Sequence, residues 1–360
     1  MKKIIDIIIQ TFVLLFLVLT IILPKKAFSE NENRYLQKFP ILNVENLSSG
    51  QFMTQMSSYI ADHFPLRESF LSFKTNIFKM IGIKRQNDVY YADDDYLIEE
   101  YDKPENNKKI INVVNRFIDM IPDVKYEFML VPTAAYIYQD KIPHYNLNYD
   151  EKSTIDFFKQ NFKGNYVDVS NILLSNSNKY IYYRTDHHWT TRGAYYAYYE
   201  YCKQNGIVPH DYTFVKVSED FYGTIYSKVL DGTIKPDIIE KIIDDNQYIV
   251  KYANLNTNSM YGEKFLNEKD KYSFFLNGNQ SLMTISNSNI LDKELLIIKD
   301  SYANSFIPLI ASHYSKIHVI DPRYYKNKIS DYLKDNNIKH VLFLYNIGTI
   351  DDDLGILSIN

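Results

Sequence analysis

Cysteine is almost absent from this 360-residue chain, which has Cys202 alone. A single cysteine excludes an intrachain disulfide and any metal site built from several cysteines. Glycine and proline number only 11 each, too few for a collagen-like or linker-rich protein. An excess of one charge is also missing, since 40 Lys and Arg stand against 44 Asp and Glu, a net charge of −4. We therefore do not expect nucleic-acid binding, which needs a basic surface.

The chain has the composition of a packed globular protein. Hydrophobic residues make up 46% and charged residues 23%, and 33 Tyr with 21 Phe supply much of the apolar volume. The length corresponds to about two domains, or to one large domain with insertions.

The longest apolar run covers residues 4–23, and residues 2–3 and 25–26 beside it are lysines. Twenty helical residues span about 30 Å, enough to cross the hydrocarbon of a bilayer. We expect residues 1–26 to form a single-pass membrane anchor. The alternative is a signal segment cleaved near Ala27-Phe28-Ser29, although the preceding lysines favour the anchor. Both alternatives place the rest of the chain outside the cytoplasm.

Two further regions are expected after this segment. Residues 27–106 read as a helical region with a hairpin that packs on the core, and two helices within residues 50–82 break at Pro65. The hairpin consists of apolar residues on either side of the acidic turn 93–95. Residues 107–360 read as an α/β catalytic domain, with a β-rich insertion at about residues 211–289.

From residue 108 onward, apolar strands alternate with amphipathic helices. Strands are expected at residues 127–131, 166–169, 295–298, 317–320 and 340–345. Helices are expected at residues 108–121, 154–162, 302–313 and 326–336. Strands separated by helices of this length pair in parallel, and the helices cover both faces of the sheet. The expected fold class is therefore α/β.

The densest group of chemically useful side chains is Arg184-Thr185-Asp186-His187-His188-Trp189. It follows the strand-like residues 180–183 and precedes a helix capped by Thr190 or Thr191, so we expect a strand-to-helix loop. In extended backbone, Asp186 and His188 point to the same side. The carboxylate can then accept the imidazole Nδ1–H and orient the ring as a general base.

A second group follows the buried strand at residues 295–298. Ser301 lies where that strand ends and a helix begins, which exposes a hydroxyl beside the helix N–H groups. Ser301 is the candidate nucleophile, and a helix cap is the alternative. Further oxyanion or substrate candidates lie at neighbouring strand ends or in the two groups. They are Asn346, Tyr345, Tyr302, Asp321 and Arg184.

Several motifs, in order along the chain, resemble one bacterial family. They are residues 32–34 with 39–40, 62–67, 131–133, 221–224 and 299–302, together with Asp186-His187-His188-Trp189. The set resembles the DHHW protein family, which is similar to the alginate O-acetyltransferases of the AlgJ and AlgX kind in the SGNH-hydrolase-like superfamily. The resemblance covers roughly residues 30–350.

The resemblance implies an SGNH-hydrolase-like sheet, with Ser301 as nucleophile, His188 as general base and Asp186 as its orienting carboxylate. It implies an extracytoplasmic O-acetyltransferase that modifies a cell-surface polysaccharide or exopolysaccharide, supplied with acetyl groups by a membrane-bound O-acyltransferase. No cofactor and no metal is expected. Lys299 stands where ordinary hydrolases of this superfamily have glycine, which leaves the oxyanion donors open.

Three alternatives remain at this point. An acetyl esterase would use the same triad with water as acceptor, and a non-catalytic polysaccharide-binding or assembly protein would use tyrosines to stack on sugars. A metal hydrolase built on Asp186, His187 and His188 is the third, but adjacent histidines seldom reach one ion.

Overall fold

The computed structural model describes residues 2–253 and 255–360, except the side chains of residues 2 and 21. Met1 of the expected anchor and Asn254 of the expected insertion therefore lie outside the described residues. The chain divides into two compact units. Unit 1 comprises residues 1–87 and 226–234, and unit 2 comprises residues 88–225 and 235–360.

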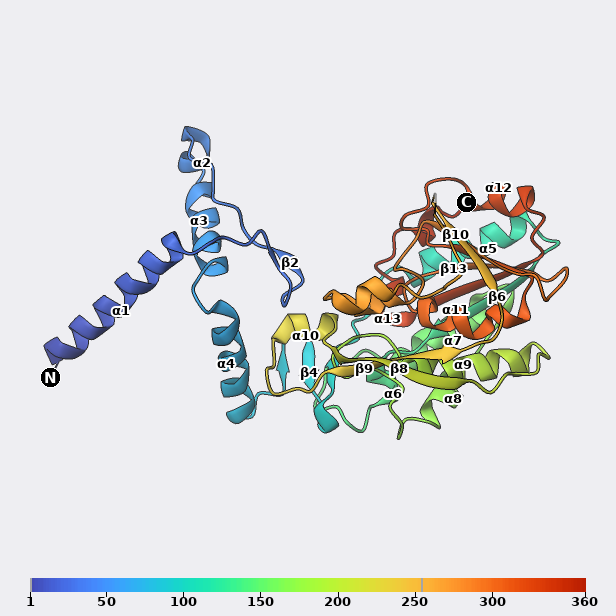
Figure 1. The fold of residues 1–360 in the computed structure, drawn as a ribbon, viewed down its shortest axis with the longest axis horizontal. Coiled ribbons are helices and arrows are strands. Elements are labelled where there is room, and N and C mark those ends of the chain that lie inside the picture. The colour runs from blue at the N-terminus through green and yellow to red at the C-terminus, as the bar shows by residue number, and fades with distance from the viewer. Residues whose placement is uncertain (1, 254) are drawn as a thin grey trace. The chain divides into compact units, whose positions relative to one another are not determined.

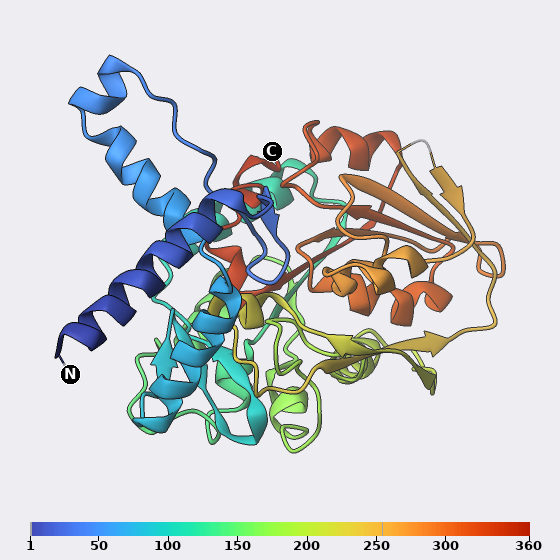
Figure 2. The ribbon, with the colours of Figure 1, turned by 60° about the vertical axis from the view of Figure 1, so that its left-hand side comes forward.

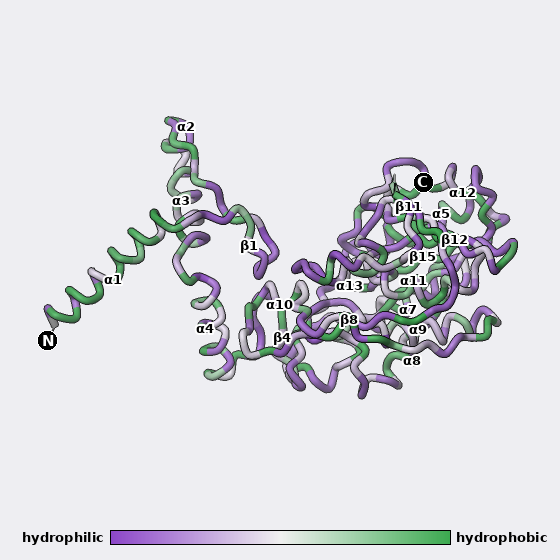
Figure 3. The backbone as a smooth tube through the Cα atoms, in the orientation of Figure 1, coloured by the Kyte–Doolittle hydropathy of each residue, from purple (hydrophilic) through white to green (hydrophobic). Residues whose placement is uncertain are grey.

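Unit 1 is mostly helical. Its elements are α1 (Lys2–Ile22), β1 (Phe28–Ser29), β2 (Arg34–Tyr35), α2 (Val44–Ser48), α3 (Gln51–Asp62), α4 (Arg67–Met80) and β3 (Arg85–Gln86). Helix α1 is apolar along nearly its whole length (Figure 3). Among the described residues it is the helix long and apolar enough to cross a membrane. Helices α3 and α4 confirm the expected pair on either side of Pro65.

Ion pairs join the segment after α1 to the turn between α3 and α4. The Arg34 guanidinium makes two hydrogen bonds with the Asp62 carboxylate, at 2.5 and 3.0 Å, and these bonds hold the pKa of Asp62 below its usual value. Arg67 pairs with Glu32 beside them. The motifs at residues 32–34 and 62–67 therefore meet within unit 1, where they fix one corner of its fold.

Unit 2 is built on an eight-stranded sheet in the order β11-β10-β12-β14-β13-β15-β6-β7. The strands are β6 (Lys125–Val131), β7 (Asn165–Tyr166), β10 (Tyr248–Tyr252), β11 (Leu255–Thr257), β12 (Leu282–Asn287), β13 (Glu294–Lys299), β14 (Lys316–Ile320) and β15 (His340–Asn346). Strands β14, β13, β15, β6 and β7 pair in parallel. Strands β12, β10 and β11 extend the sheet in antiparallel pairing.

Helices cover both faces of this sheet (Figures 1 and 2). The α-helices of unit 2 are α5 (Asn107–Met120), α6 (Ala134–Ile137), α7 (Glu151–Asn161), α8 (Ser170–Leu174), α9 (Thr191–Gln204), α11 (Ala303–Ile310), α12 (Ile329–Asp335) and α13 (Ile347–Ile350). Side chains of a strand alternate between faces, so β13 sends Leu295 and Ile297 into a core with α9 and α11. Leu296 and Ile298 enter a second core with α5, α7 and α12.

The expected β-rich segment at residues 211–289 is divided between two sheets. Strands β8 (Thr213–Phe221) and β9 (Asp237–Ile243) form a separate antiparallel pair, and α10 (Thr224–Val229) lies between them in the chain. The later strands of the segment join the main sheet instead. Short 3₁₀ helices complete unit 2, at Asp93–Asp95, Glu263–Asn267, Lys271–Phe274, Ala311–His313 and Ile356–Ser358.

The α/β class with a mostly parallel sheet, helices on both faces and an N-terminal apolar helix is confirmed. The strand expected at residues 180–183 is wrong: these residues, all described, form no strand, and Tyr182 makes an isolated bridge with Trp189. The hairpin is present as β4 (Val89–Tyr91) and β5 (Leu97–Glu99). It belongs to unit 2, which begins at Asp88.

Candidate active site at the carboxyl edge of the sheet

The parallel strands bring several polar residues to one edge of the sheet. Strands β13, β14 and β15 run in the same direction, so their carboxyl ends share an edge. Ser301 and Asp321 follow β13 and β14 there, and Asn346 is the last residue of β15. Ser301 lies between the end of β13 and the first residue of α11, and it is partly exposed. The expected strand-to-helix position of this hydroxyl is therefore present.

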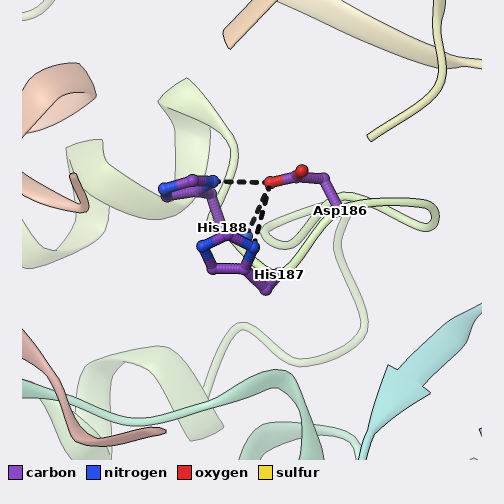
Figure 4. Close-up of side chains that lie close together, drawn as sticks. All are labelled: Asp186, His187 and His188. Carbon is purple, nitrogen blue, oxygen red and sulfur yellow. Dashed lines mark hydrogen bonds and ion pairs between the residues drawn. The ribbon is translucent and has the colours of Figure 1, made fainter. Parts of the chain in front are cut away.

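Three side chains at this edge form a continuous line of hydrogen bonds. The Ser301 Oγ lies 2.8 Å from the His188 Nε2, and the His188 Nδ1 lies 2.5 Å from the Asp186 Oδ1. Asp186 and His188 are buried, at 2% and 4% exposure. Figure 4 shows the rings of His187 and His188 both turned toward the Asp186 carboxylate. Asp186 and His188 from one loop and Ser301 from the end of β13 thus place a carboxylate, an imidazole and a hydroxyl in the order that a serine nucleophile requires.

Four donors hold the Asp186 carboxylate in place. Its Oδ1 accepts the backbone N–H and the ring Nδ1–H of His188, and its Oδ2 accepts the backbone N–H and the hydroxyl of Thr224 at 2.8 and 3.1 Å. Burial alone would raise the pKa of Asp186, but the two neighbouring imidazoles and these hydrogen bonds lower it, so the carboxylate stays ionised. A Cβ on Gly223 would collide with Asp186, so only glycine fits there.

The His188 imidazole is neutral at ordinary pH. Burial is the main cause that lowers its pKa, to about 4, and the neighbouring His187 acts in the same direction. The Tyr272 ring stacks on the imidazole at 3.6 Å between centroids and 13° between planes. The Tyr272 hydroxyl donates to the Ser301 carbonyl at 3.2 Å. A neutral, oriented imidazole is the form that can take a proton from Ser301.

Buried groups fix the loop that carries Asp186 and His188. Asp237 accepts the backbone N–H groups of Arg184 and Thr185, both at 2.8 Å, and the hydroxyl of Thr185 at 2.5 Å. The Trp189 indole N–H donates to the Tyr302 carbonyl at 3.0 Å, which ties the loop to the start of α11. Two contacts therefore hold the loop: Asp237 of β9 at its start, and Tyr302, next to Ser301, at its end.

The sequence of residues 88–320 matches the family model described as "DHHW protein". The chain belongs to the DHHW protein family. The match includes the whole line of hydrogen bonds from Asp186 to Ser301, with the DHHW tetrapeptide at residues 186–189. A search of the curated proteins finds no match.

This chain is similar to several solved structures. A DHHW family protein from Eubacterium siraeum is 25% identical, with a TM-score of 0.68 over 76% of this chain and 95% of that one. Bacillus cereus PatB1 with a sulfonyl adduct is 18% identical, with a TM-score of 0.62 over 76% of this chain and 99% of that one. The O-acetyltransferase domain of Pseudomonas putida AlgJ is 11% identical, with a TM-score of 0.46 over 73% and 92%.

Lys299 of the DHHW protein is a buried structural cation. Its Nζ donates to Asn279 and Asn304, each at 2.8 Å, and lies 3.4 Å from Asp321. Burial lowers the pKa of Lys299. Asp321 also makes two hydrogen bonds with the Arg323 guanidinium, at 2.8 and 2.6 Å. Asp321 thus balances two cations and fixes the loop after β14.

The candidate Asn346 already donates to backbone carbonyls, and the candidate Tyr345 is buried in the core. The Asn346 Nδ2 donates to the carbonyls of Val131 and Pro132, at 3.0 and 3.3 Å, and its Oδ1 accepts the Gly348 N–H. Tyr345 is fully buried in the core of the α5 face. The roles of both residues in catalysis remain predictions, and this geometry favours other oxyanion donors.

The candidates Tyr302 and Arg184 each contact residues around the site. The Tyr302 hydroxyl donates to the His187 carbonyl, and its backbone N–H donates to Asp300. The Arg184 guanidinium lies over the rings of Tyr180 and Tyr96, at 4.6 and 5.3 Å from their centroids. Direct contact of either residue with substrate stays a prediction.

Asp186, His187 and His188 offer three metal-ligating atoms within 4.8 Å of one another. Their hydrogen bonds do not fit a metal site. The His188 Nδ1 faces Asp186 and its Nε2 faces Ser301, while the His187 Nδ1 lies 2.8 Å from the Thr224 hydroxyl. A metal bound by this set would break the hydrogen bonds that hold the Asp186 carboxylate, so these residues fit a proton relay better.

Sequence reasoning missed three supporting residues: Tyr272, Asp237 and Thr224. Tyr272 comes from a 3₁₀ segment in the irregular region after β11, where no periodic pattern predicts a position. Asp237 lies at the start of β9, 51 positions after Asp186. Thr224 belongs to the motif at residues 221–224, and that motif was the one available signal for this contact.

Proposed function

We propose that this protein is an extracytoplasmic O-acetyltransferase that moves acetyl groups onto a cell-surface polysaccharide or exopolysaccharide. The observation that carries the proposal is the unbroken hydrogen-bond line from Asp186 through His188 to Ser301. The resemblance of the DHHW family to alginate O-acetyltransferases supports acetyl as the group transferred. Helix α1, which is long and apolar enough to cross a membrane, supports attachment of the protein to the membrane with the catalytic unit outside the cytoplasm.

In the first step, Ser301 attacks the carbonyl carbon of an acetyl ester. His188 takes the Ser301 proton on Nε2 as the new C–O bond forms, and Asp186 stabilises the imidazolium. The tetrahedral intermediate then collapses, the bond to the donor oxygen breaks, and His188 returns the proton to that oxygen. The product is the donor alcohol and an acetyl ester on Ser301.

Backbone groups at the start of α11 support oxyanion stabilisation. In the part of the chain that the structure describes, the Ser301 N–H donates to no protein acceptor. It lies at the N-terminal end of α11, where helix N–H groups and the helix dipole favour negative charge. We infer that this N–H receives the oxyanion, because the Asn346 amide already donates to two carbonyls.

In the second step, a sugar hydroxyl attacks the acetyl ester on Ser301. His188 takes the hydroxyl proton, the new ester forms, and Ser301 leaves with a proton from the imidazolium. The acetyl donor outside the cell must come across the bilayer, and one helix cannot form a path for it. We therefore propose a membrane-bound O-acyltransferase as the partner that supplies acetyl groups.

The test measures transfer directly. Purified full-length protein is incubated with 4-nitrophenyl acetate and with or without a neutral oligosaccharide, beside Ser301→Ala and His188→Ala. We expect acetylated oligosaccharide from the wild type, and a loss of roughly 10⁴-fold in both variants. A chelator should leave the rate unchanged.

Other outcomes separate the alternatives. Acetate release without any acetylated sugar would make the protein an esterase. Equal, slow release by wild type and both variants would favour a binding or assembly protein. Loss of activity with the chelator would favour metal chemistry at Asp186, His187 and His188. Bacillus cereus PatB1 was solved with a sulfonyl adduct, so blocking of turnover by a sulfonyl fluoride is a further check on Ser301.

A further inference from the structure

Helix α4 of unit 1 carries an exposed stripe of large apolar side chains. The stripe consists of Leu66, Phe70, Phe73, Ile77 and Met80, each between 39% and 85% exposed. Their spacing of 3, 4 and 3 residues places Phe70, Phe73, Ile77 and Met80 on one face of the helix, and Leu66 is the residue directly before its first turn. Five contiguous side chains of this size on a water-facing helix indicate a docking surface.

The stripe does not face the core of its own unit. The opposite face of α4 packs against residues 226–234, where the Thr75 hydroxyl donates to the Val229 carbonyl at 2.7 Å. The Lys79 Nζ on that face donates to Asp231 at 2.6 Å. Polar groups thus hold α4 to its unit, and the apolar groups point away. This reversed pattern needs an apolar environment outside the unit.

The contacts of α1 indicate the environment in which the stripe lies. The Phe16 ring of α1 stacks on Phe64 at 4.9 Å and lies edge-on to Phe70 at 6.2 Å, so α1 touches the corner where α4 begins. Phe16 precedes the end of α1 by six residues, about 9 Å of helix. If α1 spans a bilayer, Phe16 lies within the hydrocarbon, and Phe70 lies beside it. The stripe continues from Phe70 along α4.

We propose that the α4 stripe lies in the boundary between lipid headgroups and hydrocarbon, so that unit 1 rests on the membrane surface. The proposal rests on α1 acting as an uncleaved anchor. Exposed lysines on and beside α4, Lys74 and Lys84, fit a surface that contains anionic lipids. Phenylalanine with aliphatic residues on one face and lysine beside them is typical of interfacial helices.

The test measures the depth of single positions in a bilayer. Cysteine replaces Phe73 or Met80 in the full chain, a nitroxide label is attached, and the protein is reconstituted in phosphatidylcholine–phosphatidylglycerol vesicles. Collisions with oxygen, which concentrates in hydrocarbon, are compared with collisions with a water-soluble nickel chelate. Native Cys202 is buried, and unmodified protein should take up no label. Both replaced side chains are exposed, so the variants should fold normally.

Two further labels serve as controls. Leu14→Cys, exposed on α1, reports whether α1 itself enters the bilayer, and Ser58→Cys lies on the polar face of α3. We expect the oxygen-to-nickel ratio at positions 73 and 80 to be several-fold higher than at Ser58→Cys. A ratio equal to that at Ser58→Cys, with a high ratio at Leu14→Cys, would overturn the proposal while leaving the anchor intact. None of these readouts depends on Ser301.

A protein occupant would give a different result. If a second copy covers the stripe, labels at positions 73 and 80 would be shielded from both oxygen and nickel. Their spectra would also broaden through contact between labels, and dilution with unlabelled protein would remove the broadening. That outcome would overturn lipid docking in favour of a dimer.

Discussion

His188 is the residue whose protonation decides activity in this account. Its burial lowers the pKa of the imidazole to about 4, while Asp186 remains ionised because four donors hold its carboxylate. The base is therefore neutral, and able to accept the Ser301 proton, throughout the range in which an ordinary histidine titrates.

The first prediction concerns pH. Activity requires neutral His188, so kcat/KM for an aryl acetate should rise as pH increases through about 4 and stay level through 6.5. The measurement is a pH profile of the full-length protein, limited to pH values at which circular dichroism shows the fold intact. An acidic limb centred near 6.5, the value of an unperturbed histidine, would contradict the burial argument.

The second prediction concerns Tyr272. Tyr272→Phe keeps the ring on the imidazole and removes the hydrogen bonds that its hydroxyl makes with the Ser301 carbonyl and the Ser305 hydroxyl, so kcat should fall by a few-fold. Tyr272→Ala also removes the stacked ring, and kcat should fall by about a further tenfold. Equal kcat values for the two variants would show that the stack does not orient His188.

Among the elements, the 184–189 loop depends on β9 for its shape. The Asp237 carboxylate accepts three hydrogen bonds from Arg184 and Thr185 and one from the Tyr180 hydroxyl at 2.5 Å. Burial raises the pKa of Asp237, and these hydrogen bonds act against that rise. The buried Asp237 carboxylate thus accepts the backbone N–H groups that a neighbouring strand would otherwise bond.

The third prediction follows from that role. Asp237→Ala leaves buried donors without an acceptor, and the free energy of unfolding should fall by about 3 kcal/mol. Turnover should fall as well, because Asp186 and His188 lose their fixed backbone. Glu219→Ala, at an exposed carboxylate of β8, is the matched control and should change stability by less than about 0.5 kcal/mol. Urea unfolding of the two variants measures these changes in stability. Equal unfolding midpoints for Asp237→Ala and Glu219→Ala would refute the role of Asp237.

The sequence was informative where local pattern dominates. Apolar periodicity located the parallel strands of the main sheet, and a hydroxyl between a buried strand and a helix indicated Ser301. Strands β10, β11 and β12 were expected only as part of a β-rich insertion, and they join the main sheet. It failed at residues 180–183, whose apolar side chains suggested a strand. Tyr182 and Tyr183 are indeed buried, but Asp237 and the bridge from Tyr182 to Trp189 satisfy the local backbone in place of a sheet. Such contacts between distant residues, like the Tyr272 stack, leave no periodic signal.

For the whole molecule, the N-terminal segment decides where the chemistry takes place. The fourth prediction is that the mature protein keeps α1. Mass spectrometry of the membrane fraction should find a peptide that spans Ala27-Phe28-Ser29, because the lysines after the apolar run favour an uncleaved anchor. A mature chain that starts near residue 28 and appears in the soluble fraction would contradict it.

The most direct test of the central claim is the site of acetylation. Full-length protein is mixed with 4-nitrophenyl acetate, quenched in acid and digested, and the acetylated peptide is sequenced by mass spectrometry. The account predicts one acetyl group on Ser301, much less of it in His188→Ala, and none in Ser301→Ala. An acetyl group on another residue, or equal labelling of all three proteins, would contradict it.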